Sequence, residues 1–355
     1  MVSNSKCLAT RRRLLQAAGA SALVVAAPAA GQTTSNSGRL PTRHIVDVHV
    51  HVGSPPRISA LAASMRSARD WVVQRSRDPA AFAEMMSEVQ EDNSGTLLAK
   101  MDEYGVSHAI IQPSPGSGSA NQLIADAVRQ SAGRMFGLYR PEFLMNDVGA
   151  GNLSLVRDRR TLVRNARRAA DDIERLFPEL GLIGVGEVIP GGFVTAETDP
   201  VAIARDLGPI MEALRPHRRP IQFPTASSAW RGGLYYLYEP LWVDEVAGNF
   251  PDVPIVLAKM GRGIRASFDA CTVVAMRNAN VYFDMSDSTA EHLREAIERI
   301  GARRIMFGTD LNGVSVNYAH AVGFNTVSTA GLSQEEWDWI AWRTANEVYR
   351  LGLES

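Results

Sequence analysis

The sequence is short of the residues that build several common classes of protein. It contains only two cysteines, Cys7 and Cys271, which excludes a disulfide framework and a cysteine-rich zinc site. Any metal would therefore be held by histidine and carboxylate. The formal net charge is −1 and no long basic run follows residue 13, so the charged surface that nucleic acid requires is missing. With 45% hydrophobic and 21% charged residues, the composition is that of an ordinary globular protein.

Residues 1–31 have the pattern of an export signal. Three arginines at 11–13 precede a 17-residue apolar stretch, Leu14 to Ala30, which ends in small residues of the kind that a signal peptidase cleaves. This pattern resembles a twin-arginine signal, which implies the twin-arginine export machinery as a partner and a periplasmic or otherwise exported protein. A membrane anchor is the alternative, but the stretch is rich in alanine and at the short limit of a spanning helix. We interpret residues 32–43 as a linker.

The rest of the chain alternates eight times between short apolar runs and helical patterns. Because runs such as 255–258 are apolar throughout, we expect parallel strands covered by helices. The expected strands are 45–50, 108–112, 135–139, 182–187, 220–223, 254–259, 280–284 and 304–308, and helical spacing occurs at 161–177, 201–214, 289–300 and 333–351. Residues 44–355 are thus predicted to form an α/β fold, a (β/α)8 barrel of the TIM type. A doubly wound open sheet is the alternative, and the lack of a glycine-rich phosphate loop after any strand favours the barrel.

The ends of the expected strands are unusually polar, and in a parallel barrel these ends hold the chemistry. The first strand ends in Asp47, His49 and His51, which are spaced by two residues and therefore point to the same side. The last strand ends in Asp310. Because the first and eighth strands are neighbours in a closed barrel, we expect His49, His51 and Asp310 to share one cation. Two imidazoles, a carboxylate and an open position suit a catalytic ion that lowers the pKa of water to about 7.

Several short motifs follow one another in a fixed order from residue 44 to the end of the chain. They are His49-Val50-His51, Met101–Val106, Gly133–Gly137, Asn249–Asp252, Val281–Ser286 and Gly308-Thr309-Asp310. Together they resemble the amidohydrolase superfamily, in the branch of aminocarboxymuconate-semialdehyde decarboxylase, aromatic-acid decarboxylases and lactone or ester hydrolases. The resemblance implies a metal-dependent-hydrolase barrel in which Asp310 both contacts the metal and handles a proton.

Two positions depart from the pattern of that family. Its fifth strand ends in a metal-binding histidine and its sixth in a catalytic histidine, whereas Phe223 and Lys259 stand there in this sequence. His320, in the expected loop after the eighth strand, is the one histidine that could substitute. Glu187, at the end of the fourth expected strand, is a further candidate ligand, or a carboxylate anchored to arginine or lysine.

Lys259 stands out because only three of the 37 basic residues are lysines. A chain that fills its surface with arginine has little reason to place a lysine at the end of a buried strand. The ammonium could anchor a substrate carboxylate, act as a general acid or base if burial lowers its pKa, or form a Schiff base. The alternative is a structural ion pair with Glu187, Asp284 or Asp310.

Residues beyond the strand ends indicate the kind of ligand. Arg57 and Arg262 follow the first and sixth strands and favour an anionic substrate, and we include His320 among the candidate substrate contacts. Trp230 and Tyr235 favour a planar ligand, although these rings could equally pack on the barrel or on a second subunit. The inserted segment 54–94 is expected to form a lid over the first strand, or else a homodimer contact.

The sequence therefore predicts an exported metal-dependent hydrolase that acts on a small ester, lactone or amide. His49, His51, Asp310 and Glu187 would hold one divalent ion, with zinc as the first choice, and Asp310 and Lys259 would be catalytic. Non-oxidative decarboxylation of an aromatic acid is the second prediction. A binding protein that has lost catalysis is the alternative from another class, and a metal-free lysine enzyme is a third. We expect a small-molecule substrate and no nucleic-acid partner.

Overall fold

The computed structural model describes residues 40–86, 88–114, 120–140, 159–188, 199–226 and 238–354. The predicted export signal, most of the predicted linker, Trp230 and Tyr235 lie outside these ranges. No helix within them is both long enough and apolar enough to cross a membrane.

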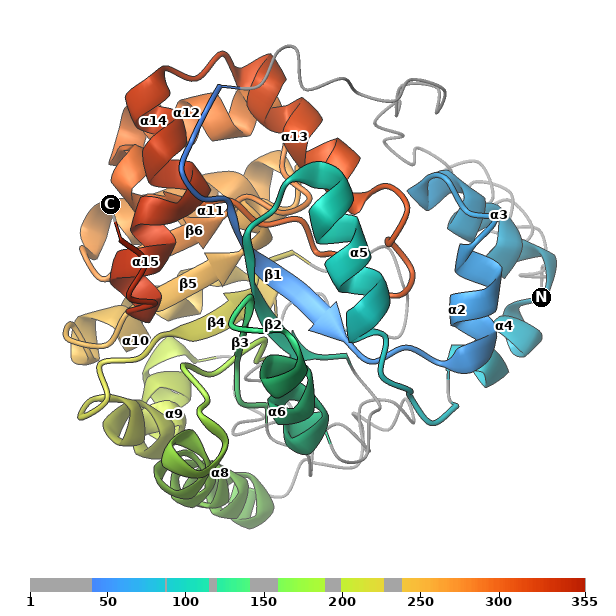
Figure 1. Cartoon of the computed structure of the whole chain (residues 1–355). Coiled ribbons are helices and arrows are strands. Elements are labelled where there is room, and N and C mark those ends of the chain that lie inside the picture. Colours follow the sequence, from blue (N-terminus) through green and yellow to red (C-terminus); the bar gives the residue numbers. More distant parts are fainter. Residues whose placement is uncertain are drawn as a thin grey trace, which may run out of the picture. The chain divides into compact units, whose positions relative to one another are not determined.

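Parallel strands form the centre of the structure, and helices surround them (Figure 1). One sheet has the order β1-β2-β3 and the other the order β4-β5-β6-β7. All pairings within them are parallel, as the apolar runs predicted. The bounds are β1 Val46–Val52, β2 His108–Pro113, β3 Met135–Gly137, β4 Ile221–Pro224, β5 Ile255–Ala258, β6 Val281–Asp284 and β7 Ile305–Met306.

Two connections join these sheets into a closed barrel. The segment predicted as the fourth strand is extended, and its Val185 bridges Tyr139 on one side and Ile221 on the other. The eighth expected strand, 304–308, contains β7. Its Phe307 O accepts a hydrogen bond from Val48 N at 3.0 Å, and Leu311 O accepts one from His51 N at 2.8 Å. The eighth strand and the residues that follow it therefore pair with β1. The predicted (β/α)8 barrel is confirmed, and the open-sheet alternative is wrong.

The helices lie close to the positions that their spacing predicted, and polar caps fix several of their ends. Thr289 accepts a hydrogen bond from His292 N at the start of α12, and Asp199 accepts one from Val201 N at the start of α9. The outer helices are α5 Ser94–Tyr104, α6 Ala120–Gln130, α8 Arg159–Leu180, α9 Pro200–Leu214, α10 Val243–Asn249, α11 Arg265–Arg277, α12 Ala290–Ile300, α13 Ala319–Ala330, α14 Gln334–Asp338 and α15 Thr344–Tyr349. Single tighter or wider turns are η2 Pro240–Trp242, η3 Lys259–Gly261, η4 Ala302–Arg304 and η5 Trp339–Arg343.

Three short helices form the segment predicted as an insertion after the first strand: α2 Pro56–Ala62, α3 Ala68–Arg77 and α4 Pro79–Met86. They lie on the side towards which β1 points (Figure 1). Trp71 Nε1 donates to Val314 O at 2.7 Å, and Asn317 Nδ2 donates to Ala62 O at 2.6 Å. The insertion is therefore docked on the loop that follows Asp310, and its role as a lid stays a prediction.

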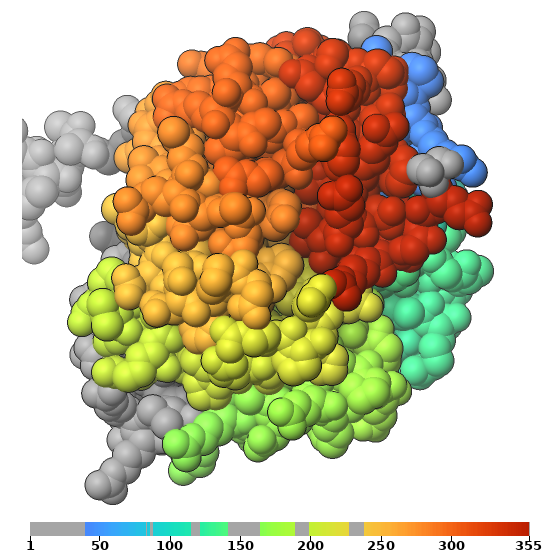
Figure 2. Space-filling model, turned by 90° about the vertical axis from the view of Figure 1, so that its left-hand side faces the viewer, coloured from blue at the N-terminus to red at the C-terminus, as the bar shows by residue number. Residues whose placement is uncertain are grey.

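The barrel begins earlier than the sequence suggested. Leu40 O accepts a hydrogen bond from the buried indole of Trp337 at 3.0 Å, and Pro41 O accepts one from Gln334 Nε2 at 2.6 Å. Figure 2 shows this blue end of the described chain beside the red C-terminal segments. Residues 40–43, which we interpreted as linker, therefore pack on the barrel.

Candidate metal centre

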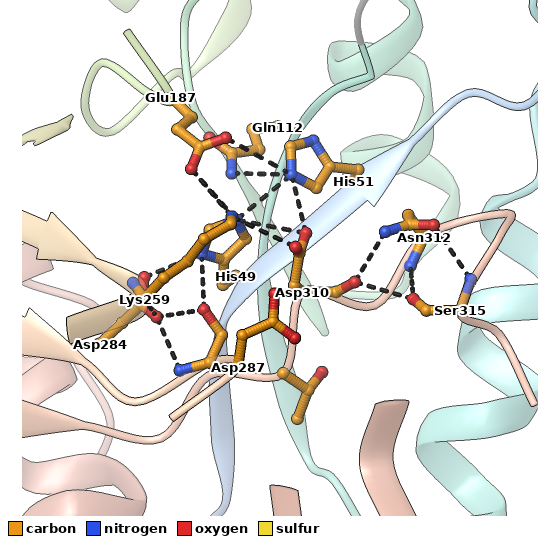
Figure 3. Close-up of polar contacts among 12 residues, drawn as sticks. His49, His51, Gln112, Glu187, Lys259, Asp284, Asp287, Asp310, Asn312 and Ser315 are labelled. Atoms are coloured by element: carbon orange, nitrogen blue, oxygen red, sulfur yellow. Dashed lines mark hydrogen bonds and ion pairs between the residues drawn. The ribbon is translucent and has the colours of Figure 1, made fainter. Parts of the chain in front are cut away.

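Three side chains from opposite ends of the chain meet at the carboxyl ends of the strands (Figure 3). His49 Nε2 and His51 Nε2 are 3.2 Å apart, and Asp310 Oδ1 lies 3.5 Å from the first nitrogen and 3.3 Å from the second. One ligand atom from each residue lies within 4.8 Å of the others. The predicted convergence of two imidazoles and a carboxylate is confirmed.

Hydrogen bonds on the far side of each ring turn both Nε2 atoms towards this point. His49 Nδ1 is 2.8 Å from Asp284 Oδ2, and both side chains are fully buried. His51 Nδ1 is 3.4 Å from Pro113 O. A histidine that donates from Nδ1 keeps a lone pair on Nε2, and metal-binding histidines are held in this way. The donor set therefore fits a divalent metal ion.

The charges around the rings favour an added cation. Burial and the ammonium of Lys259 would each lower the pKa of His49, but the carboxylates of Asp284 and Asp310 outweigh them and raise it to about 9. Burial would raise the pKa of Asp310, yet Lys259 and His49 hold it well below its usual value. Burial lowers the pKa of His51. The carboxylates of the centre thus favour a positive charge at His49 Nε2, which either a proton or a divalent ion would supply.

Lys259 lies inside this cluster at the end of β5. Its Nζ is 3.0 Å from Glu187 Oε1, 3.2 Å from Asp310 Oδ2 and 3.1 Å from His49 Nε2. Burial alone would lower the pKa of the ammonium, but Asp310 and Glu187 raise it above the usual lysine value. The ion pair that the sequence analysis gave as the alternative is therefore present, with Glu187 and Asp310 as the partners. The lowered pKa on which a general acid or base role depended is therefore not found, and this environment does not favour the neutral amine that a general base or a Schiff base needs.

Glu187 faces the histidine pair from the extended segment between β3 and β4. Its Oε1 lies 3.7 Å from His49 Nε2, and its Oε2 lies 3.9 Å from His51 Nε2. Burial would raise its pKa, but Lys259 lowers it, so the carboxylate stays ionised. Glu187 is placed both to hold Lys259 and to approach an ion held by the histidines.

Several residues of the centre have a left-handed backbone. The φ angles are 68° at Lys259, 55° at Asp310, 54° at Asp287 and 52° at Arg262. Residues with a Cβ rarely adopt this region, and such residues concentrate at functional sites at a cost of about 1–3 kcal/mol each. No pattern in the sequence predicts these left-handed backbone conformations.

Of the two predicted substrate-binding arginines, Arg57 lies on the insertion, and Arg262 lies beside the centre, where its charge interacts with Asp310 and Glu187. Arg57, whose side chain is 49% exposed, pairs with Glu84 at 2.9 Å and with Glu88 on the insertion. Arg262 pairs with Asp287 at 2.8 Å. These two arginines therefore already have carboxylate partners.

His320 lies in α13 and not in a loop, and only 2% of it is exposed. Its Nε2 is 3.2 Å from Asp47 Oδ2. The carboxylate of Asp47 also accepts hydrogen bonds from the backbone and hydroxyl of Thr309, so it braces the turn before Asp310. His320 does not belong to the cluster of ligand atoms, which corrects the expectation that it could substitute for a missing histidine.

Phe223 packs in the core. It is fully buried, and its ring packs on Trp242 with the centroids 4.9 Å apart. Its neighbour Gln222 instead reaches Val48 O at 3.1 Å and Tyr349 Oη at 2.6 Å. Lys259 thus occupies a family histidine position at the centre, whereas Phe223 belongs to the core.

Sequence reasoning missed Gln112 and Arg140 beside the centre, and it missed that Asp284 contacts His49. Asp284 orients His49, Gln112 places its Nε2 3.4 Å from His51 Nε2, and Arg140 shares the acceptor Pro113 O with His51. Each residue lies at the end of, or just beyond, an expected strand. The rule that led to His49 and Asp310 could therefore have found them.

A barrel with histidine and carboxylate ligands at its carboxyl end is the architecture of metal-dependent hydrolases and related lyases. Residues 156–351 match the family model described as amidohydrolase. The chain therefore belongs to the amidohydrolase family. No curated protein matches its sequence.

Solved structures with the same fold cover nearly the whole chain at low identity. A dihydroxybenzoic acid decarboxylase from Polaromonas sp. JS666, with bound manganese and the inhibitor 2-nitroresorcinol, has a TM-score of 0.58 at 16% identity over 88% of this chain and 98% of that one. A 5-carboxyvanillate decarboxylase from Novosphingobium aromaticivorans, complexed with manganese, has a TM-score of 0.55 at 14% identity, covering 89% and 100%. A probable 2-pyrone-4,6-dicarboxylic acid hydrolase from Acinetobacter baumannii has 0.53 at 13%, covering 87% and 100%.

Proposed function

We propose that the chain is a metal-dependent hydrolase that cleaves a small ester, lactone or amide. The observation that carries this proposal is the convergence of ligand atoms from His49, His51 and Asp310 within 4.8 Å of one another. These three residues would hold the ion and would leave positions for water and substrate, and open positions distinguish a catalytic ion from a structural one.

The residues around the ion would divide the work of hydrolysis. When bound, the ion would polarise the substrate carbonyl and lower the pKa of water. Asp310, which its neighbours keep ionised, takes the proton of the attacking water and returns it to the departing alcohol or amine. Lys259, 3.2 Å from Asp310 Oδ2, stabilises the negative charge that develops on the substrate oxygen. One water is consumed, and an acid plus an alcohol or amine is released.

We propose zinc as the resident ion and Glu187 as an additional ligand. Two imidazoles with one or two carboxylates suit zinc, whereas manganese prefers a larger share of oxygen. The manganese in two similar structures makes that ion the alternative outcome.

Elemental analysis of the purified protein tests the proposal. We expect one divalent ion per chain in the wild type and its loss in His49→Ala and Asp310→Ala. His217→Ala is the matched control, because the ring of His217 packs on Phe177 in a tilted arrangement away from the centre and its loss should leave the metal content unchanged. A wild-type protein that takes up neither zinc nor manganese would refute the proposal and leave a non-catalytic binding protein or a metal-free lysine enzyme. Esters, lactones and amides offered to the metal-loaded enzyme then test the reaction.

Non-oxidative decarboxylation of an aromatic acid is the second candidate, and the position of Lys259 favours it. The ammonium, held between Glu187 and Asp310, faces the centre where a substrate carboxylate would lie. The reaction would release carbon dioxide and place a proton on the ring carbon. Release of carbon dioxide from hydroxybenzoates, without cleavage of any ester or lactone, would select this candidate.

We further propose twin-arginine export, which rests on the residue pattern at 11–30 alone. Replacing the three arginines at 11–13 by lysine should move the protein from the periplasmic to the cytoplasmic fraction. An unchanged distribution would refute export by this route.

A further inference from the structure

Arg140 is a buried arginine at the catalytic end of the barrel that the proposed reaction does not use. Arg140 follows Tyr139, whose backbone forms a parallel bridge with Val185. Arg140 therefore lies at the carboxyl end of the third expected strand. Only 9% of the residue is exposed. Asn121 fixes its backbone, since Asn121 Nδ2 donates to Arg140 O at 2.8 Å and Arg140 N donates to Asn121 Oδ1 at 2.9 Å. The long side chain therefore leaves the barrel wall from a fixed point.

The guanidinium of Arg140 lacks a carboxylate partner. Among the described residues, no carboxylate oxygen lies within 4.0 Å of its nitrogens, and its one side-chain hydrogen bond runs from Nη1 to Pro113 O at 2.8 Å. The neighbouring cations differ: Arg262 pairs with Asp287, and Lys259 pairs with Glu187. Burial lowers the pKa of the Arg140 guanidinium, and Glu187 favours its charge only from beyond 4.0 Å. A buried charge without a close counter-ion is costly to the fold, and one bond to a carbonyl does not offset that cost.

The position of this charge links it to the metal centre. Pro113 O accepts from Arg140 Nη1 at 2.8 Å and lies 3.4 Å from His51 Nδ1. One carbonyl oxygen thus joins the guanidinium to the Nδ1 side of His51, and the charge of Arg140 also interacts with Glu187. Figure 3 shows Gln112, the residue before Pro113, beside His51 and Glu187. An anion held by Arg140 would therefore lie next to the ligands and not at a remote surface.

We propose that Arg140 binds a carboxylate of the substrate and so makes the centre selective for acids. A guanidinium has five N–H donors, and one of those of Arg140 is hydrogen-bonded to Pro113 O. The others form the planar fork that matches a carboxylate. The sequence analysis expected Arg57 and Arg262 to bind an anionic substrate, but both side chains already pair with carboxylates. We therefore assign the binding of the anion to Arg140. The inference rests on the proposed function in one respect: the reacting group of the acid is taken to lie at His49, His51 and Asp310.

Calorimetric titration of benzoate, with uncharged benzamide as its counterpart, tests the proposal on the full chain with and without zinc. We expect benzoate to bind the wild type, and to bind Arg140→Met more weakly by about tenfold or more. Arg140→Lys, which keeps the charge but loses the fork, should be intermediate. Benzamide should not distinguish these proteins. Arg277→Met is the matched control, because this exposed arginine pairs with Asp244 on the surface and its loss should leave benzoate binding unchanged.

Three results would overturn the inference: no benzoate binding by the wild type, equal benzoate affinity in Arg140→Met, or benzamide binding as tight as that of benzoate. A loss of zinc in Arg140→Met would also overturn it, since Arg140 would then act by fixing Pro113 O and His51. If Arg140→Met does not fold, the comparison of wild type with Arg140→Lys decides. Benzoate binding that depends on Arg140 in a chain that holds no metal would refute the proposed hydrolase and keep this site. If the chain binds zinc but its benzoate binding does not depend on Arg140, the proposed hydrolase stands and the carboxylate site at Arg140 is refuted.

Discussion

Asp284 offers the sharpest test of how the centre is built, because it touches a ligand without being one. Its Oδ2 lies 2.8 Å from His49 Nδ1 and fixes the ring with Nε2 towards Asp310. Its Oδ1 accepts hydrogen bonds from Lys259 N at 3.1 Å and from Ser286 N at 2.9 Å. Asp284→Asn keeps the shape of the side chain but replaces one oxygen by an NH2 group.

The amide of the variant cannot satisfy both sets of donors. If its oxygen faces His49, its NH2 group meets the two backbone N–H groups; if it is reversed, the NH2 group meets His49 Nδ1–H. Loss of such an orienting partner costs about 10–100-fold in metal affinity. That range corresponds to about 1.4–2.8 kcal/mol. Because Asp284 is fully buried, no water replaces the lost acceptor, and we expect the upper half of the range.

Competition with a chromophoric chelator measures this change in zinc affinity. Asp244→Asn serves as the matched control, because Asp244 is a partly exposed carboxylate that pairs with Arg277 away from the centre. We expect the control to bind zinc like the wild type. If Asp284→Asn also binds zinc as tightly as the wild type, the ring of His49 is not held by Asp284, and the argument for a preorganised ligand set fails.

Three further predictions concern other parts of the chain. Lys259→Met should tighten zinc binding by about tenfold or more in the same competition assay, because a cation beside the ligand atoms is removed, and equal or weaker binding would contradict this. Glu336, whose pKa the side-chain hydrogen bonds of Arg294 lower to about 2, stabilises the fold above pH 4.5 and loses this effect as the pH falls through 2. Glu336→Gln should therefore cost about 1 kcal/mol in urea unfolding at pH 7, and the difference from wild type should shrink towards pH 2. Trp71→Phe loses the hydrogen bond to Val314 O and should speed amide exchange in residues 312–318, and unchanged exchange would show that the insertion does not hold this loop.

Much of the fold and the core of the site could be predicted from sequence because both follow from periodicity. Apolar runs separated by helical segments specify parallel strands with covered faces, and eight of them close a barrel. Closure makes the first and last strands neighbours, so residues 49, 51 and 310 meet although about 260 positions separate them. The same reasoning applies to Asp284 and Arg140, whose positions at strand ends could have been read in the same way.

The remainder depended on partners that sequence does not reveal. Arg57 pairs with carboxylates because α4 folds back on α2, and no local pattern predicts that contact. Whether the pKa of Lys259 is raised or lowered depends on how near Glu187 and Asp310 lie, since burial lowers this pKa and ion pairing raises it. His320 failed as a ligand because α13 begins at Ala319 and carries it into the core instead of leaving it in a loop.

The insertion after β1 is coupled to the metal centre through the backbone of Asp310. This ligand has a left-handed φ of 55°, which the surrounding structure must hold in place. Its carbonyl accepts hydrogen bonds from Asn312 Nδ2 and Ser315 Oγ, each at 2.8 Å (Figure 3). The same loop is tied to the insertion, because Val314 O accepts from Trp71. A displacement of the inserted helices would therefore pull on the loop that fixes Asp310, so a segment that supplies none of the three ligand atoms still helps to set their geometry.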